Sequence, residues 1–270
     1  MSPVPPPRLR EAFDSPALKA RYVRRLFSTI APRYDVITRL LSYGQDQRWK
    51  ARVVALATTR PAPPPSGALR VLDLACGTGD LTFRLARTGA SAIGLDVTEA
   101  MLVVAERRLH EGEAPAGTVR FLAGDMMALP CPDAAFDVVT AGYGLRNVPS
   151  LEPSLREIVR VIRPGGVFVS LDFNRPSNAL LRWAYLTYLR AVGATLGVVL
   201  HGDSETYRYI PASIVRYPGA PAVAELMTRV GFRTATWMPV LGGLMAIHVA
   251  GKAGEGADGA AVERGAGDLR

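Results

Sequence analysis

The sequence is poor in cysteine and histidine. Its 270 residues include two cysteines, Cys76 and Cys131, and three histidines. Two cysteines cannot build a disulfide framework or a four-ligand zinc site, and no histidine-rich cluster offers a metal site. We therefore expect no bound metal. The chain does not open with a basic segment followed by an apolar one, as a signal peptide would, so we expect a cytoplasmic protein.

Acidic residues are scarce near the N-terminus, and this region carries the whole excess of positive charge. Residues 1–60 contain 12 Lys or Arg and 4 Asp or Glu, and the net charge of the full chain is +8. A basic segment on a neutral body suits docking to an anionic lipid surface, a nucleic acid or an acidic partner. A solvated helix face is the alternative, and composition does not decide between them.

No apolar segment is long enough and free enough of charged residues to be expected to span a membrane. Residues 180–200 are strongly apolar, but Arg190 lies near the middle of this stretch. A central arginine costs about 2.5–3.5 kcal/mol on insertion scales. We therefore expect a mobile apolar lid or a surface-docking helix, with a buried helix as the alternative.

The apolar pattern divides the chain into segments. From residue 69 onward, apolar strands alternate with amphipathic helices, which is typical of a parallel sheet covered on both faces. Strands are expected at 70–75, 92–96, 118–123, 136–141, 166–173, 232–239 and 243–251, and helices at 79–88, 99–111, 151–162 and 220–230. Residues 1–15 and 253–270 are expected to be disordered, and residues 60–68 form a Pro-rich linker. Residues 16–59 are expected to form a helical cap that Pro32 divides into two helices. The catalytic domain is expected at 69–252, with a helical insertion at 176–216.

The most informative motif is a strand that runs into a Gly-x-Gly turn, VLDLACGTGD at residues 71–80. Ligands of open α/β sheets bind at the carboxyl ends of the strands. A dinucleotide site needs a third glycine where this chain has Thr82, and no Walker lysine follows. Asp73 and Asp80 would also repel a phosphate, so the turn indicates a site for a nucleoside without a phosphate group.

Carboxylates end or follow the neighbouring strands. Asp96 ends the second strand, 17 residues past Gly79, where an acidic side chain accepts both ribose hydroxyls. Asp125 follows the third strand and suits an adenine amino group. Together with Asp73 they predict a negative pocket that favours a cationic nucleoside, and S-adenosylmethionine matches this description. For Asp73, capping of backbone amides is the alternative.

Several motifs between residues 20 and 252 resemble those of one family. They include FS-x-IA-x-x-YD from residue 27, LP-x-PD-x-x-FD from residue 129, GLRNV from residue 144 and YRYI-x-x-SI from residue 207. The chain is similar to the ubiquinone/menaquinone-biosynthesis C-methyltransferases, and two further segments look closest to the branch that acts on prenyl- or phytyl-naphthoquinones. The resemblance implies a Rossmann-like class I α/β methyltransferase with a seven-stranded, mostly parallel sheet, helices on both faces, N-terminal helices and a helical insertion after strand 5.

The resemblance also implies the reaction and the cofactor. A methyl group would pass from S-adenosylmethionine to a ring carbon of a quinol that carries an isoprenoid or phytyl tail. The predicted cofactor-binding residues are Asp73, Gly77, Thr78, Gly79, Asp96, Val97, Asp125, Met126 and Gly142. The family commonly has a serine at position 142 and a glycine at position 76. A nucleophilic Cys131, as in RNA cytosine methyltransferases, is not favoured because LPCPD fits the family pattern.

Carbon methylation needs a phenolic proton to be removed or its charge to be offset. Arg146 is predicted to stabilise a phenolate, with a loop-fixing salt bridge as the alternative, and Asn147 to orient the ring or a water. Asp80 would accept a proton through water, and Tyr34 would close the site unless it is simply core. These four residues are the catalytic candidates, and the predicted substrate-binding residues are Tyr143, Tyr207 and Tyr209.

A lipid tail would bring the enzyme to a membrane surface. Arg21, Arg24 and Arg25, beside Trp49 and the 180–200 helix, are predicted to dock at the inner face of the membrane. The expected partner is a lipophilic quinol and not a nucleic acid, because the fourth strand ends in AGYG. A homodimer stays open. The other readings are a methyltransferase for a different lipophilic molecule and a non-catalytic quinone-binding protein.

Overall fold

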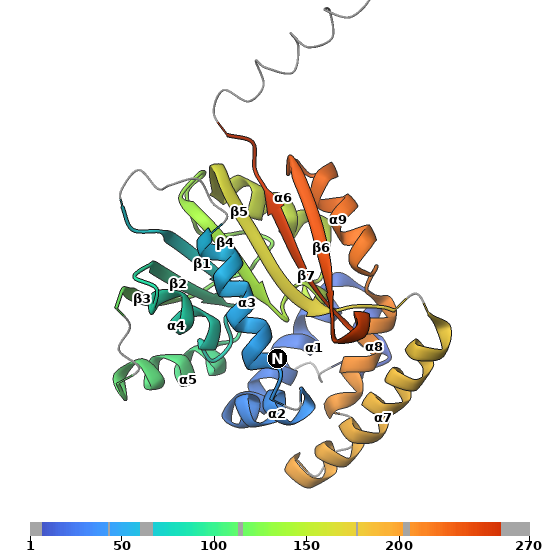
Figure 1. Cartoon of the computed structure of the whole chain (residues 1–270). Coiled ribbons are helices and arrows are strands. Elements are labelled where there is room, and N and C mark those ends of the chain that lie inside the picture. Colours follow the sequence, from blue (N-terminus) through green and yellow to red (C-terminus); the bar gives the residue numbers. More distant parts are fainter. Residues whose placement is uncertain are drawn as a thin grey trace, which may run out of the picture.

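The computed structural model describes residues 7–42, 44–59, 67–112, 116–176, 178–201 and 206–254, which form one α/β unit (Figure 1). The sheet has seven strands in the order β3-β2-β1-β4-β5-β7-β6. β1 to β5 are parallel, and β7 pairs antiparallel with both β5 and β6. This confirms the predicted Rossmann-like fold. The strands are β1 (Arg70–Leu74), β2 (Ser91–Asp96), β3 (Thr118–Ala123), β4 (Phe136–Gly142), β5 (Ile162–Phe173), β6 (Thr234–Val240) and β7 (Met245–Gly251).

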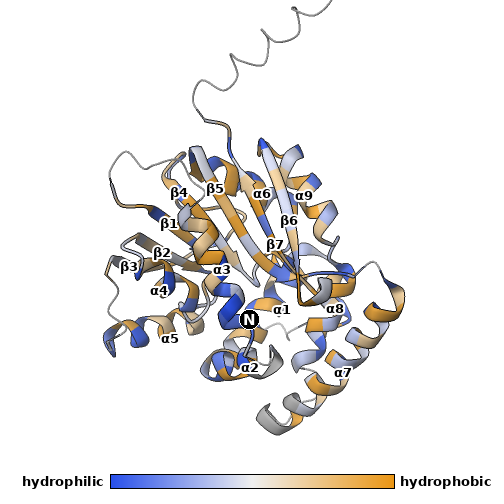
Figure 2. Cartoon of the chain, viewed as in Figure 1, coloured by the Kyte–Doolittle hydropathy of each residue, from blue (hydrophilic) through white to orange (hydrophobic). Residues whose placement is uncertain are grey.

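Helices cover both faces of the sheet. On one face, α3 (Asp46–Thr59) and α4 (Asp80–Ala86) pack on the strands; on the other, α6 (Leu151–Val161) and α9 (Ala220–Arg229) do so. Most residues of the central strands are buried and apolar residues predominate in them (Figure 2), because both sides of each strand are covered. α5 (Glu99–His110) packs beside β2 and β3.

The N-terminal cap contains one helix more than the sequence suggested. α1 (Pro16–Ile30) begins at Ser15, whose hydroxyl accepts a hydrogen bond from the amide of Leu18 at 3.2 Å. Pro32 lies in a 3-10 turn and separates α1 from α2 (Tyr34–Leu41), as predicted. A second break precedes α3, where Gly44 adopts a φ of 72° and its amide donates to the carbonyl of Arg39. This glycine signal was overlooked.

The expectation that residues 1–15 are disordered is wrong for residues 7–15. Glu11–Phe13 form a 3-10 helix with Ala12 fully buried. The ring of Phe13 stacks on Tyr209 with a centroid separation of 5.8 Å, so tertiary packing orders a segment of weak local preference. Residues 1–6 and 255–270, and residues 60–66 of the predicted linker, lie outside the described residues.

The insertion after β5 consists of α7 (Ala179–His201), a 3-10 turn and α8 (Tyr209–Arg216). α7 projects beyond the sheet (Figure 1). Leu186 and Leu189 are buried, whereas Leu180 and Trp183 are 74% and 65% exposed, so the helix is neither a core helix nor a polar one. Within the described residues, no helix combines the length and apolar character needed to cross a membrane.

Candidate active site

The loop after β1 brings the backbone close to the carboxyl edge of the sheet. Gly77 and Gly79 adopt φ values of 57° and 85°, which favour glycine. A Cβ on Gly79 would lie 2.8 Å from the ring of Phe121 and 2.9 Å from that of Phe83. Gly79 therefore allows α4 to pack closely, and it does not line the cleft described next.

A first hollow, which we call the nucleoside cleft, lies beyond the ends of β1, β2 and β4. Asp96 Oδ2 accepts a hydrogen bond from the amide of Gly77 at 2.9 Å, and Oδ1 accepts one from Thr98 at 2.8 Å. Burial raises the pKa of Asp96, while these hydrogen bonds work in the opposite direction. The residues that line the cleft include Arg24, Gly77, Asp96, Val97, Asp125, Met126, Gly142, Tyr143 and Asn147.

The polar groups of this cleft fit S-adenosylmethionine. The carboxylates of Asp96 and Asp125 are acceptors, as ribose hydroxyls and an adenine amino group require. The amide of Met127 donates to Asp125 Oδ1 at 2.9 Å and fixes its orientation. Asn147 Oδ1 is buried without a hydrogen-bond partner among the described residues, so it is available to a ligand donor. These acceptors do not suit a pyrophosphate.

Besides Gly79, two predicted cofactor residues do not line the nucleoside cleft. Asp73 accepts hydrogen bonds from the hydroxyls of Thr82 and Thr140 at 2.6 and 2.8 Å, and burial raises its pKa to about 6. Its hydrogen-bond partners among the described residues are thus two hydroxyls, and not the backbone amides of the alternative reading. The Thr78 hydroxyl donates to Asp35 Oδ1 at 2.7 Å and ties the loop to α2. Neither residue lines the nucleoside cleft.

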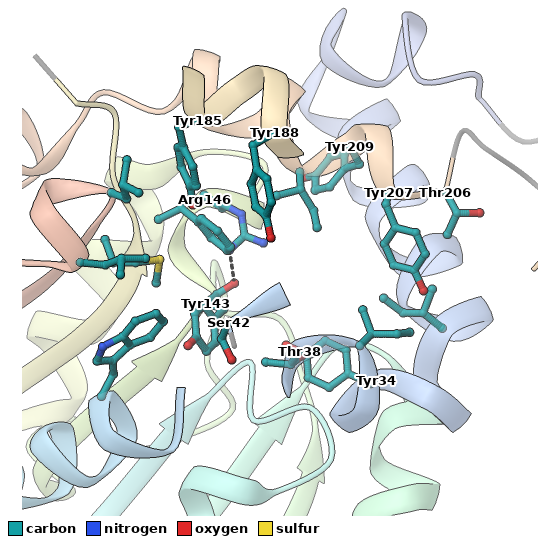
Figure 3. Close-up of a pocket in the computed structure, with 18 of the residues that line it drawn as sticks. Tyr34, Thr38, Ser42, Tyr143, Arg146, Tyr185, Tyr188, Thr206, Tyr207 and Tyr209 are labelled. Atoms are coloured by element: carbon teal, nitrogen blue, oxygen red, sulfur yellow. Dashed lines mark hydrogen bonds between the residues drawn. The ribbon is translucent and has the colours of Figure 1, made fainter. Parts of the chain in front are cut away.

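A second and larger hollow, the aromatic cavity, has a volume of about 450 Å³. Its wall comes from the cap, the insertion and the ends of β5 and β7, and it is mostly apolar. Figure 3 shows Tyr185, Tyr188 and Tyr209 on one side of the space and Tyr34 and Tyr143 on the other. All three predicted substrate residues, Tyr143, Tyr207 and Tyr209, line it. Tyr34 and Tyr143 line both hollows, so they mark where the two meet.

Arg146 is the cationic side chain of the aromatic cavity. Its Nη1 donates to Asp172 Oδ1 at 2.7 Å and to the carbonyl of Tyr143 at 3.1 Å, and its guanidinium lies 4.4 Å from the ring of Phe173. Burial opposes the charge, but Asp172 raises the pKa of Arg146. Nε is buried and unpartnered within the described chain. The residue thus makes the predicted salt bridge and also faces the cavity.

Two further catalytic candidates, Asn147 and Asp80, do not line the aromatic cavity. Asn147 lines the nucleoside cleft and not the aromatic cavity, and its Nδ2 donates to the carbonyl of Tyr143 at 2.9 Å. Asp80 is paired with Lys50 at 2.8 Å. Burial favours the neutral carboxyl, but Lys50 lowers the pKa of Asp80 overall. A carboxylate held charged in an ion pair is a poor proton acceptor, so the structure does not favour that role.

Three charged residues of the site escaped the sequence reasoning. Lys50 follows Trp49 in the sequence but received no predicted role. Lys19 of α1 donates to the carbonyls of Arg146 and Val148 at 3.0 and 2.6 Å, and burial lowers its pKa to about 8. Asp172 anchors Arg146. No spacing rule links Lys19 to a turn 127 residues away.

Among the described residues, His248 and Cys76 do not form a second reactive centre. His248 is buried in the core, where Nε2 lies 3.0 Å from the carbonyl of Ala220, and burial lowers its pKa. Burial disfavours the charged form of Cys76 as well, so it raises the pKa of this thiol and keeps it protonated. Among the residues with described positions, no group of three or more metal-binding side chains is found.

Comparison with known proteins identifies relatives over most of the chain. Residues 16–252 match the model of the ubiE/COQ5 methyltransferase family. A demethylmenaquinone methyltransferase from Thermus thermophilus is 42% identical over 226 residues, which cover 83% of this chain and 98% of that protein. A ubiquinone/menaquinone biosynthesis C-methyltransferase UbiE from Azotobacter vinelandii is 39% identical over 233 residues, covering 85% and 89%. These are enzymes, so the non-catalytic reading gains no support.

Solved structures agree with the fold. A SAM-dependent methyltransferase from Thermotoga maritima superposes with a TM-score of 0.59 at 17% identity, covering 85% of this chain and 99% of that one. Magnesium protoporphyrin IX methyltransferase from Synechocystis, with bound S-adenosylhomocysteine, gives a TM-score of 0.51 at 18% identity, covering 77% and 84%. With the cleft, the fold and the relatives in agreement, the chain belongs to the ubiE/COQ5 methyltransferase family and is an S-adenosylmethionine-dependent C-methyltransferase.

Proposed function

We propose that this enzyme methylates a ring carbon of a naphthoquinol that carries a prenyl or phytyl tail, with demethylmenaquinol as the first candidate. The names of the relatives, which refer to demethylmenaquinone and to ubiquinone/menaquinone biosynthesis, support a quinol of this kind. The observation that carries the proposal is the meeting of a carboxylate-lined cleft and an aromatic cavity at Tyr34 and Tyr143. A ring at this boundary would face the donor while its tail lies among apolar side chains.

The walls of the aromatic cavity suit a flat ring with an apolar chain. Phe27, Ile30, Trp49, Phe173 and Leu181 contribute apolar surface, and tyrosines contribute ring faces with polar tips. Arg146 is the cation among the described residues that line the cavity. A quinol oxygen placed at Arg146 would leave the tail among the apolar side chains of the cavity.

S-adenosylmethionine, when bound, supplies an electrophilic methyl group, and the residues must prepare a weak carbon nucleophile. Ionisation of a quinol hydroxyl raises electron density at the adjacent ring carbon. The donor would supply its methyl carbon to that ring carbon as its carbon–sulfur bond broke. The hydroxyl proton and then the ring proton would leave to solvent, and the product oxygen would take one proton back. Arg146 Nε can donate to the quinolate oxygen and offset its charge, and such a donor is worth about 10²–10³-fold in turnover.

Tyr34 and Asn147 would position the reactants. Burial raises the pKa of Tyr34, so its hydroxyl stays protonated at neutral pH and can donate to a ring oxygen. Asn147 Oδ1 would hold the nucleoside. Fixing two reactants in this way can supply about 7–11 kcal/mol of the barrier reduction.

We also propose that the enzyme takes its substrate from a membrane surface. Leu180 and Trp183 are exposed on α7, the helix whose Leu181 and Tyr185 line the aromatic cavity. Arg21, Arg24 and Arg25 of α1 are exposed, which supports a role in docking. Trp49, in contrast, lines the cavity and is not part of a docking face.

Vesicle binding tests this docking. At low salt the protein should co-sediment with vesicles that contain anionic phospholipid, because each basic residue near such a surface contributes about 1 kcal/mol. Trp183→Ser should weaken the association, whereas Trp237→Ser, a change of an exposed tryptophan on β6, should not. Failure of the native protein to bind would contradict membrane docking.

Radiolabelled methyl transfer tests the substrate. Demethylmenaquinol, its phytyl counterpart and a demethoxylated benzoquinol are offered in parallel under reducing conditions. We expect transfer to both naphthoquinols at a higher kcat/KM than to the benzoquinol. Preference for the benzoquinol, or transfer to none of the three, would reject the proposed substrate class.

A further inference from the structure

A further hollow lies between α7 and α8, two helices that run side by side in the insertion (Figure 1). It has a volume of about 510 Å³, and its charged lining residues are Arg190, Arg208 and Arg216, so we call it the arginine groove. None of the residues that line it also lines the nucleoside cleft or the aromatic cavity. The groove is therefore separate from the site of methyl transfer.

The shape of the groove follows from the order of large and small residues in the sequence. From Arg208 to Arg216, the lining residues of α8 and the turn before it recur at intervals of three and four, which places them on one helix face. Arg190 and Ala194 line the groove from α7, one turn apart. Ala194 and Ala212 are too small to fill the space between the helices, so a hollow remains between the longer arginines.

The charge of the groove suits a phosphate group. Three exposed guanidinium groups line it, and no carboxylate does so among the described residues. Arg216 is held in place, because its Nη1 donates to the carbonyl of Ala212 at 3.2 Å and its guanidinium lies 4.1 Å from the ring centre of Phe13. A guanidinium that stacks on a ring keeps N–H donors along its edge, and their fork matches the oxygens of a phosphate.

The surroundings of the groove favour a phosphate that carries apolar chains. Trp183 precedes Arg190 by seven residues and therefore lies on the same face of α7, where it is exposed. Val198 is exposed one turn beyond Ala194, and Val215 is exposed within the groove itself. A free phosphate would make no use of these side chains. A phospholipid would place its phosphate between the arginines and its acyl chains against the exposed apolar residues.

We infer that the arginine groove binds the phosphate of an anionic phospholipid, whose acyl chains lie against the exposed apolar face of α7. The inference rests on the proposed membrane docking and adds a site for one headgroup to a surface that attracts lipid through its overall charge. Leu181 and Tyr185 of the same helix line the aromatic cavity. A lipid bound in the groove would thus hold the wall of the cavity at the membrane surface, where a quinol with a long tail resides.

Short-chain lipids, kept below the concentration at which they form micelles, test the groove without a membrane. Calorimetry on the full chain compares dihexanoyl phosphatidylglycerol, dihexanoyl phosphatidylcholine and glycerophosphoglycerol, which has the anionic headgroup without the chains. The native protein should bind the anionic lipid about tenfold more tightly than the choline lipid, because the arginines repel the choline cation. It should also bind the anionic lipid about tenfold more tightly than glycerophosphoglycerol, which lacks the apolar contacts.

Two variants and a matched control locate the binding. Arg190→Gln combined with Arg208→Gln should weaken binding of dihexanoyl phosphatidylglycerol at least about tenfold, the effect of one lost hydrogen bond between charged groups. Ala212→Leu fills the groove without a change of charge and should weaken the same lipid. Arg107→Gln combined with Arg229→Gln removes two exposed arginines from α5 and α9 and should bind all three ligands as the native protein does. Thermal unfolding checks that each variant folds.

The outcomes separate the groove from membrane docking. Equal affinity of the native protein for the three ligands would overturn the inference even if no variant folds, and so would unchanged lipid affinity in both groove variants when they are folded. Tighter binding of a single-stranded oligonucleotide than of the anionic lipid, lost in the same variants, would also overturn it. Binding of the short-chain lipid as stated, without co-sedimentation of the protein with vesicles, would support the groove and reject membrane docking alone.

Discussion

The nucleoside cleft and the aromatic cavity are built in opposite ways. The polar groups of the cleft come mainly from the ends of adjacent parallel strands, where backbone amides orient Asp96 and Asp125. The cavity is assembled from helices that lie far apart in the sequence, the cap before β1 and the insertion after β5. The comparison indicates that sheet topology fixes the cofactor, while the helices added around it determine which molecule is methylated.

The largest effect should come from breaking the cleft. Asp96→Ala removes the acceptor that holds the amides of Gly77 and Thr98, together with the expected acceptor for the ribose. Affinity for S-adenosylhomocysteine, measured by calorimetry, should fall at least about 100-fold, as expected for the loss of buried hydrogen bonds to a charged group. Quinone binding, followed by quenching of Trp49, should persist. An unchanged cofactor affinity would contradict the cleft assignment.

A large effect on turnover is expected from the cavity side. Arg146→Ala should lower kcat about 100-fold at saturating cofactor, since it removes the donor to the quinolate. Affinity for S-adenosylhomocysteine should change little. The variant leaves Asp172 buried without its partner, which costs about 3–5 kcal/mol of stability, so Arg146→Lys serves as the charged control. If turnover and cofactor affinity fall together, Arg146 is a folding residue only.

A smaller effect should follow from narrowing the cavity. Ala184 is exposed on α7 and lines the cavity, so Ala184→Trp is expected to fold. KM for a quinol with a long tail should rise about tenfold, because a larger side chain displaces apolar contacts worth about 1–3 kcal/mol. KM for a tail-less naphthoquinol is the control and should stay constant. An equal rise for both substrates would place the tail elsewhere.

The smallest effect concerns Lys19, which joins the cap to the turn between the two hollows. Burial lowers its pKa from 10.5 to about 8 in the folded protein. Between these two pKa values the unfolded chain binds more protons at Lys19 than the folded chain does. The free energy of unfolding therefore rises with pH across this window, and Lys19 adds no pH dependence below it. The contribution reaches at most about 1.4 kcal/mol per pH unit. Urea unfolding of Lys19→Met should lack this component of the slope; a slope identical to that of the native protein would assign the titration elsewhere.

The cofactor half of the molecule was largely readable from the sequence. Alternation of apolar strands and helices predicted the sheet, and a parallel sheet brings the ends of neighbouring strands together, so Asp96 and Asp125 were found from strand ends alone. The hydrogen bonds of Asp73 to Thr82 and Thr140 could not be predicted, because they depend on how side chains face inside the packed core. The contact of Thr78 with Asp35 was not predictable for a similar reason, since Asp35 comes from the cap.

The substrate half was less accessible to such reasoning. Tyr207 and Tyr209 followed only from the family resemblance, and Tyr185 and Tyr188 were missed although they lie in the expected insertion. Periodicity predicts which face of a helix is apolar, but not which distant helix it meets. The pairing of Lys50 with Asp80 and the stacking of Phe13 on Tyr209 are contacts of this kind.

The position of β7 has a consequence for how the protein is made. β7 lies between β5 and β6, and β6 pairs with no other strand of the described sheet. During translation, β6 leaves the ribosome first but has no place to attach until residues 245–251 follow. The apolar edge of β5 thus stays open until late in synthesis, a period when chaperone binding would protect the nascent chain from aggregation.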